Sequence, residues 1–394
     1  MDFTQIFGLL SGLLVLAFVA NRLFRITRIP DLIILLFMGL LLGPVLHLIE
    51  PGKFTTFTHT LGNLALILIL FEGGLELRIK ESLRHFPGGV LLAFIGYGLS
   101  FAAVAAAVHW GMHMSWHAGF LLGGVFGCTS STVIMPVLQQ MQVREPVKLT
   151  LLLESALGDI FGVLTVSSLI DINVGQPIVK LFFSGLATRV IIAVLLSVAA
   201  GLLWTRIWPY LSEQRFSNVL SFGIVLGIYA GTRAAGGSGL LAVLAFGLTL
   251  GNASPHPIEA HGGMLEFHSE LSFLVRSFFF VLLGVEVEFV SASYIWPMVA
   301  IIAALLISRA VAISISRMAL RDITPKERET IFFMLARGLI TAVLAVEVTN
   351  VRGDEFGFLP AMALTVMTVT NLLLVVGSVR ATRHANVAEQ VAGS

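Results

Sequence analysis

The stretch Phe120-Leu-Leu-Gly-Gly-Val-Phe-Gly-Cys128-Thr-Ser-Ser-Thr132-Val-Ile-Met135 places a polar run in the middle of an apolar segment. The apolar flanks indicate a helix that spans a membrane, which takes about 20 apolar residues for about 30 Å of hydrocarbon. The run Cys128–Thr132 is the most polar one inside any apolar segment of the chain. Because irregular backbone at membrane depth is tolerated only where it is buried in protein or lines a cavity, we interpret the run as a break in the helix.

The composition of the whole chain is that of a polytopic membrane protein. Of its 394 residues, 57% are hydrophobic and only 12% are charged, whereas soluble domains carry about 25% charged residues. The mean hydropathy is +0.94. These values exclude a soluble enzyme. The net charge of +1 offers no basic field for nucleic acid, and the single cysteine excludes an internal disulfide framework.

About thirteen membrane-spanning segments follow when the apolar runs are divided at charge clusters and at Pro/Gly turns. They lie near residues 4–24, 29–48, 60–79, 87–109, 117–140, 147–171, 183–207, 216–233, 238–252, 265–289, 295–317, 327–349 and 356–379. Loops after odd-numbered segments carry sixteen Lys and Arg residues, and loops after even-numbered segments carry four. Because cytoplasmic loops hold the basic excess, we expect the N-terminus outside and the C-terminus in the cytoplasm.

The two halves of the chain repeat each other. Gly39-Leu-Leu-Leu-Gly43 returns 208 residues later as Gly247-Leu-Thr-Leu-Gly251, and Gly74-Leu-Glu-Leu returns 210 residues later as Gly284-Val-Glu-Val. The offset equals seven segments, an odd number, so the second copy has inverted topology, as in many transporters. We predict two inverted six-helix repeats over residues 1–182 and 216–379, a linking helix over 183–215 and a short cytoplasmic tail over 380–394.

A second break is expected at the position equivalent to the first one. Residues 209 positions after Cys128 read Arg337-Gly338-Leu-Ile-Thr341, inside the twelfth segment. Inverted-repeat transporters form their sites where such discontinuous helices cross. The residues expected at the crossover are Cys128, Ser130, Ser131, Thr132, Gly338 and Thr341.

Ionisable residues lie on the segment between the two breaks, in Leu151-Leu-Leu-Glu154-Ser155-Ala-Leu-Gly158-Asp159. Charged groups at membrane depth are costly and mark ion paths by default. Glu154 and Asp159 are about 140° apart around a helix, whereas Ser155 and Asp159 share one face. We therefore expect Asp159 and Ser155 to face the site.

Glu154 is expected to face a structural partner instead. Arg337, an intramembrane cation that is never neutral, is the predicted partner. Arg309 also lies in an apolar run. We interpret it as structural, paired with an acid such as Glu270.

The transported ion is predicted to be a hard monovalent cation, because such ions prefer oxygen ligands and the candidate site residues offer oxygen atoms. Asp159, Glu72 and the hydroxyls of Thr129 and Ser155 supply them. A carboxylate binds either the cation or a proton, so each displaces the other, which suffices for exchange. No cofactor is expected, and the absence of a Walker A sequence argues against transport driven by ATP.

Five motifs resemble the monovalent cation:proton antiporter superfamily, in particular its electroneutral Na⁺/H⁺ exchanger (NhaP-like) branch. They are Glu154-Ser-Ala-Leu-Gly-Asp159, Phe71-Glu-Gly-Gly-Leu75, Gly236-Gly-Ser-Gly-Leu-Leu-Ala-Val243, Phe278-Phe-Phe-Val-Leu-Leu-Gly284 and Arg337-Gly338. The resemblance implies a homodimer in membrane lipid, with thirteen helices per protomer. Each protomer would hold a dimerisation domain and a core domain, about 87–171 and 295–379, that moves like an elevator.

The resemblance also implies the roles of single residues. Asp159 is the essential ion-binding carboxylate, with Ser155, Thr129 and Glu72 as coordinating partners. Glu154 and Arg337 would form the structural ion pair of the electroneutral branch. One residue departs from the pattern, because the position before the aspartate is Asn or Asp in the family and Gly158 here.

The function predicted from the sequence is a secondary Na⁺/H⁺ antiporter of a prokaryotic inner membrane, and not an enzyme. Exchange of one ion for one proton is favoured, although Gly158 leaves the stoichiometry open, and Na⁺, K⁺ and Li⁺ all remain candidates. The alternatives are a K⁺/H⁺ antiporter of the potassium-efflux type and a sodium-coupled solute symporter. No nucleotide-binding domain is expected.

Overall fold

The computed structural model describes residues 3–27, 29–49, 52, 54–77, 87–141, 143–170, 172, 178–212, 214–253, 257–287 and 291–392. In these ranges every regular element is a helix, and eight helices are long and apolar enough to cross a membrane. The prediction of an all-helical membrane protein is therefore confirmed. The count of thirteen spans stays a prediction, and the predicted segment ends at 79, 171 and 289 lie outside the described residues.

The described chain forms two compact units, and helices α3 (Thr55–Glu76), α8 (Glu145–Leu169) and α12 (Pro257–Glu286) contribute residues to both. The other helices of the first unit are α1 (Phe3–Thr27), α2 (Asp31–Leu40) with its π-helical continuation Leu41–Val45, α5 (Pro87–Gly111), α6 (Trp116–Gly127), α7 (Ser131–Gln139), α13 (Ile295–Ile315), α14 (Pro325–Phe333), α15 (Leu339–Arg352) and α16 (Leu359–Ala392). The second unit adds α9 (Ile178–Leu211), α10 (Ser217–Ala234) and α11 (Gly239–Ala253). Short 3₁₀ turns cover Ala292–Tyr294, Ser316–Met318 and Gly353–Phe356. The division into repeats over 1–182 and 216–379, joined by 183–215, concerns the origin of the sequence and stays a prediction.

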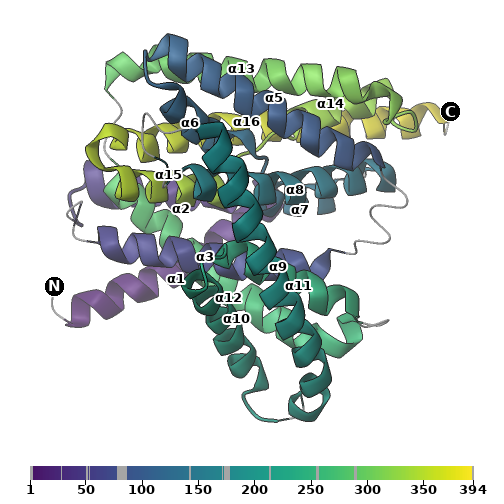
Figure 1. Ribbon diagram of the computed structural model, residues 1–394. Coiled ribbons are helices and arrows are strands. Elements are labelled where there is room, and N and C mark those ends of the chain that lie inside the picture. Colours follow the sequence, from purple (N-terminus) through teal and green to yellow (C-terminus); the bar gives the residue numbers. More distant parts are fainter. Residues whose placement is uncertain are drawn as a thin grey trace. The chain divides into compact units, whose positions relative to one another are not determined.

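Helices α5 and α13 pack side by side in the first unit, and α6 packs on α5 (Figure 1). Between α5 and α13 the hydroxyl oxygens of Ser100 and Ser308 lie 2.9 Å apart, and both side chains are buried. A buried hydroxyl is costly unless it is hydrogen-bonded, so this bond fixes how the two helices face each other. The two serines are 208 residues apart, the spacing that also separates Gly39 from Gly247.

Repeated glycine motifs allow two close helix crossings, one in each unit. In the first unit a Cβ atom on Gly43 would lie 2.6 Å from the carbonyl oxygen of Val285 on α12. In the second unit a Cβ atom on Gly74 of α3 would lie 2.6 Å from the carbonyl oxygen of Leu244 on α11. Side chains do not fit at these distances, and small residues are the usual means by which membrane helices approach each other.

In the second unit, α9 packs against α11 and α10. Large apolar side chains on α9, including Ile191, Leu195 and Leu203, are exposed. A continuous exposed apolar face is rare on soluble proteins and is typical of a surface in contact with lipid or with another chain.

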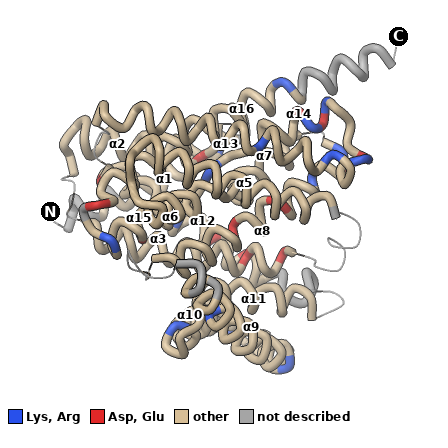
Figure 2. Tube along the Cα trace, turned by 45° about the horizontal axis from the view of Figure 1, so that its top comes forward, with Lys and Arg blue, Asp and Glu red and all other residues tan. Residues whose placement is uncertain are grey.

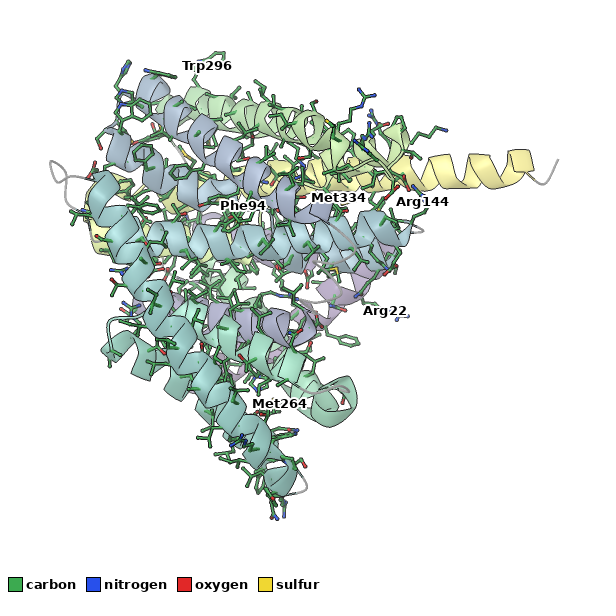
Figure 3. The ribbon with its side chains drawn as sticks, turned by 45° about the vertical axis from the view of Figure 1, so that its right-hand side comes forward. Arg22, Phe94, Arg144, Met264, Trp296 and Met334 are labelled. Atoms are coloured by element: carbon green, nitrogen blue, oxygen red, sulfur yellow. The ribbon has the colours of Figure 1, made fainter. Side chains whose placement is uncertain are left out.

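Charged groups of the first unit gather where α14 begins (Figure 2). Thr324 and Glu327 form a capping box there, with the Thr324 hydroxyl accepting from the Glu327 N–H and the Glu327 carboxylate accepting from the Thr324 N–H. The carboxylate of Glu327 also binds Arg144, which precedes α8, at 2.5 Å. Figure 3 shows Arg144 and Trp296 toward opposite ends of this unit, with Met334 between them. The residues around Met334 form the site described next.

Candidate ion-binding site

Two interruptions of helices meet inside the first unit. Residues 128–130 separate α6 from α7, and residues 334–338 separate α14 from α15. The N–H of Ser130 donates a 2.9 Å hydrogen bond to the carbonyl oxygen of Ala336. This bond pairs an N–H group of the first interruption with a carbonyl group of the second, and both groups lie outside the helices.

Gly338 makes this contact possible. A Cβ atom at this position would lie 2.7 Å from the Cβ of Ser130, and it would be closer still to the Ser130 hydroxyl oxygen. Any side chain would force the two interruptions apart. Steric hindrance thus explains why a glycine follows Arg337 in the sequence.

Asp159 points at the beginning of α7. Its Oδ2 accepts a 2.7 Å hydrogen bond from the hydroxyl of Ser131 and a 3.4 Å hydrogen bond from the Ser131 N–H. Ser131 is the first residue of α7, and the N-terminus of a helix favours a negative charge through its free N–H groups and its dipole. Asp159 is 3% exposed, and its Oδ1 has no hydrogen-bond partner among the described residues. The carboxylate therefore has one oxygen held by the protein and one oxygen available.

Of the two predicted hydroxyl ligands, Ser155 lies near this carboxylate in the sequence, and Thr129 is brought toward it by the fold. Ser155 is fully buried one turn before Asp159, and its hydroxyl donates to the carbonyl oxygen of Leu151 at 2.8 Å, which leaves its oxygen free to accept or to coordinate. Thr129, in the first interruption, packs against α8 at Gly158, where a Cβ atom would lie 3.6 Å from the threonine hydroxyl oxygen. The structure thus brings Thr129, Ser131 and Asp159 to one place.

Glu72, the fourth predicted ligand, lies on α3 among the residues of the second unit. Its role as a ligand of the ion at Asp159 stays a prediction.

Glu154 forms its ion pair with Arg309 on α13, and not with Arg337 as the sequence predicted. Both side chains are buried. Arg309 also donates hydrogen bonds to the carbonyl oxygens of Ile331, at 2.7 Å, and Met334, at 3.0 Å. These carbonyls end α14, so the guanidinium serves both the carboxylate and the unsatisfied end of the broken helix. The suggested pairing of Arg309 with Glu270 is wrong for the same reason.

Arg337 instead holds the two interruptions together. Its Nε donates to the carbonyl oxygen of Phe126 at 2.9 Å, and its Nη1 donates to the carbonyl oxygen of Leu335 at 2.6 Å. Phe126 lies at the end of α6, and Leu335 lies in the second interruption. A cation beside the C-terminal end of a helix is stabilising, because carbonyl dipoles point at it.

The remaining residues predicted for the crossover lie in the interruptions or in the first turn after them. The hydroxyl oxygens of Ser130 and Thr132 are 2.9 Å apart. The Sγ of Cys128 lies 3.9 Å from the hydroxyl oxygen of Thr341, so it connects the first interruption with the first turn of α15.

Sequence reasoning missed two residues of α16 that support the second interruption. Thr370 accepts from the Arg337 N–H at 3.2 Å, and the amide of Asn371 donates to the Arg337 carbonyl oxygen at 2.9 Å. Asn371 is fully buried in an otherwise apolar run. An amide in such a run was the available signal, since buried amides need partners.

The fold and the site together define an integral membrane protein in which two interrupted helices meet beside a buried carboxylate. The sequence model of one family, described as sodium/hydrogen exchanger, transmembrane, matches residues 13–382. The chain belongs to this family.

Similar proteins include antiporters of two kinds. The chain is 28% identical over 330 residues to the K(+)/H(+) antiporter NhaP2 of Shewanella sp. (strain ANA-3); the match covers 81% of this chain and 56% of that relative. It is 24% identical over 371 residues to the Na(+)/H(+) antiporter 1 of Methanocaldococcus jannaschii, covering 88% and 84%. The chain thus spans little more than half the length of the NhaP2 relative.

A solved structure shares the fold. The sodium proton antiporter MjNhaP1 from Methanocaldococcus jannaschii, at pH 8, superposes with a TM-score of 0.78 at 21% sequence identity. The match covers 96% of each chain. This similarity extends over the whole architecture described above.

Proposed function

We propose that this protein is a secondary antiporter that exchanges a monovalent cation, Na⁺ in the first place, for a proton. The proposal rests on the burial and the hydrogen bonding of Asp159. Asp159 is buried where two interrupted helices meet, with Oδ2 bound by Ser131 and with no hydrogen-bond partner for Oδ1 in the part of the chain that the structure describes. A buried carboxylate in this position needs a proton or a cation to balance its charge.

Competition for this carboxylate is sufficient for exchange. A proton on Asp159 removes the negative charge that a cation requires, and a bound cation keeps the proton off. Ser155 and Thr129 supply neutral oxygens beside it. Hydroxyl and carboxylate oxygens suit a hard cation, whereas no group of three His, Cys, Asp or Glu residues that could hold a metal ion occurs in the described chain.

An electroneutral exchange fits the charges at this site. Glu154 and Arg309 compensate each other. Asp159 is then the one carboxylate there without a basic side chain bonded to it in the described residues. One negative charge takes up one monovalent cation or one proton, so we propose a ratio of one to one.

Potassium is the second candidate for the cation. The relative from Shewanella at 28% identity is named a K(+)/H(+) antiporter, whereas the names of other relatives give Na(+). Hydroxyl and carboxylate ligands accept either ion, and the choice depends on the size of the cavity.

The proposed mechanism of movement is alternating access by two inverted repeats in an elevator-like fashion. The two glycine crossings support it, since they involve equivalent residues of the two halves. The contact between Ser100 and Ser308, which are equivalent by the same offset, also supports it. We further propose a homodimer in the inner membrane of a prokaryote, with a dimerisation domain, the N-terminus outside and the C-terminus in the cytoplasm, in accordance with the basic loops.

The test is transport by the purified protein in proteoliposomes with a preset pH gradient and a pH-sensitive dye inside. Addition of Na⁺, Li⁺ or K⁺ outside should dissipate the gradient with the transported cation, and Asp159→Asn should abolish the response. A response to no monovalent cation, or an equal response from the Asp159→Asn variant, would refute the proposal. Dependence of the response on an organic solute would indicate the symporter instead.

A further inference from the structure

One oxygen of the buried carboxylate of Glu154 takes no part in the hydrogen-bond network described so far. Its Oε1 pairs with Arg309. Its Oε2 is buried and has no hydrogen-bond partner among the described residues. Leaving a charged oxygen buried without a partner is among the more costly arrangements in a protein, so such an atom calls for an explanation.

A small cavity lies beside this carboxylate. Its volume is about 10 Å³, and its lining includes Glu154, Arg309, Arg337, Thr129 and Gly158. Space of about 10 to 15 Å³ holds one water molecule, provided that two to four polar groups face it. These groups are present here, and the cavity is too small for a larger ligand.

Gly158 leaves this space open. A Cβ atom at Gly158 would lie 3.5 Å from the Thr129 nitrogen and 3.6 Å from its hydroxyl oxygen, which are ordinary contact distances. A small side chain would therefore fit at this position without moving the backbone. Close packing thus does not explain why α8 contributes only a hydrogen atom here.

The charges around the cavity select a neutral occupant. Two guanidinium groups repel a cation, and the carboxylate repels an anion. Water both donates and accepts, so it serves the carboxylate oxygen and a guanidinium N–H at once. We propose that this cavity is the binding site of one structural water molecule that donates to Oε2 of Glu154 and accepts from Arg337.

The water would connect two parts of the site that share no direct hydrogen bond in the described structure. Glu154 and Arg309 hold the end of α14, and Arg337 holds the end of α6. The bridge joins these charges into one network. This water site is independent of which cation the protein carries, and of transport itself.

The direction in which Gly158→Ala changes the melting temperature tests the proposal. Alanine in a helix is normally more stable than glycine, so the variant should melt at a higher temperature if the cavity is empty. If the methyl group displaces the water, Glu154 loses a partner and the melting temperature should fall. Gly98→Ala on α5 is the matched control, because Gly98 is exposed, lies within a helix and has open space at its Cβ position. It should melt at the parent temperature or above.

A polar side chain should restore what alanine removes. Gly158→Ser supplies a hydroxyl that donates and accepts as water does, so it should melt above Gly158→Ala. A structure of the parent protein, at a resolution that shows ordered buried water, should have density between Glu154 and Arg337. No density there, or a Gly158→Ala variant that gains stability as Gly98→Ala does, would overturn the proposal whatever the transport activity of the variants.

Discussion

Arg309→Ala should be more destabilising than Arg337→Ala, although the sequence alone suggests the opposite. Arg309 neutralises Glu154, and removing one partner of a buried ion pair costs about 3 to 5 kcal/mol. The change also removes the donor to the carbonyl oxygen of Met334, which costs about 1 to 3 kcal/mol if that oxygen is left unsatisfied, whereas the carbonyl oxygen of Ile331 still accepts from the Met334 N–H. Arg337→Ala loses the donor to two carbonyls as well, but it leaves no carboxylate without its ion-pair partner.

The loss from Arg309→Ala therefore approaches the whole stability of a typical domain, about 5 to 15 kcal/mol. The assay is thermal unfolding of the detergent-purified protein, followed by the fluorescence of its five tryptophans. Glu154→Gln removes the charge that Arg309 balances, so the double variant Glu154→Gln/Arg309→Ala should melt above Arg309→Ala alone. It also provides a measurement if Arg309→Ala does not fold.

A double-mutant cycle identifies the partner of Glu154. The coupling between Glu154→Gln and Arg309→Ala should exceed the coupling between Glu154→Gln and Arg337→Ala. Equal melting temperatures of the two arginine variants, or the larger coupling for Arg337, would refute the assignment of the ion pair.

Three further changes test other parts of the site. Asp159→Asn should abolish cation/proton exchange while its melting temperature stays close to the parent value; loss of folding would instead indicate a structural role. Gly338→Ala should prevent folding through its clash with Ser130, and Ser130→Gly should restore folded protein in the double variant, as judged by size-exclusion chromatography; unchanged folding of Gly338→Ala alone contradicts the close contact. The hydrogen bond and charge of Arg144 hold the pKa of Glu327 at about 2, below its ordinary 4.5. This pair therefore contributes fully above pH 4.5 and is lost as the pH falls toward 2, so the melting temperature of the parent should drop more over that window than that of Arg144→Ala.

Much of the fold follows from the apolar pattern of the sequence. The run predicted over 238–252 is α11, Gly239–Ala253, despite its many glycines. The length of an apolar run and the charged residues that flank it determine where a membrane helix begins and ends, because apolar side chains lie in the hydrocarbon layer and charged side chains lie in water. The polar run after Gly127 was visible as well, because a break needs polar groups in an apolar context.

The partners within the site were less accessible to the sequence. Helical periodicity tells which face of α8 carries Glu154, but not which of two arginines on other helices lies opposite. Arg309 and Arg337 both occur in apolar runs, and only the packing of α13 selects Arg309. The hydroxyl of Ser131 binds Asp159 because α7 begins there, and the direction of that helix end depends on the shape of both interruptions.

The bond between Ser100 and Ser308 links two serines that are counterparts of each other if the chain consists of the two proposed repeats. In a symmetric dimer only residues on the rotation axis touch their own copies. If the halves arose by duplication of a gene, this bond once joined the same serine in two separate polypeptides. A single mutation would then have altered both sides of the contact together, whereas each side can now change by itself.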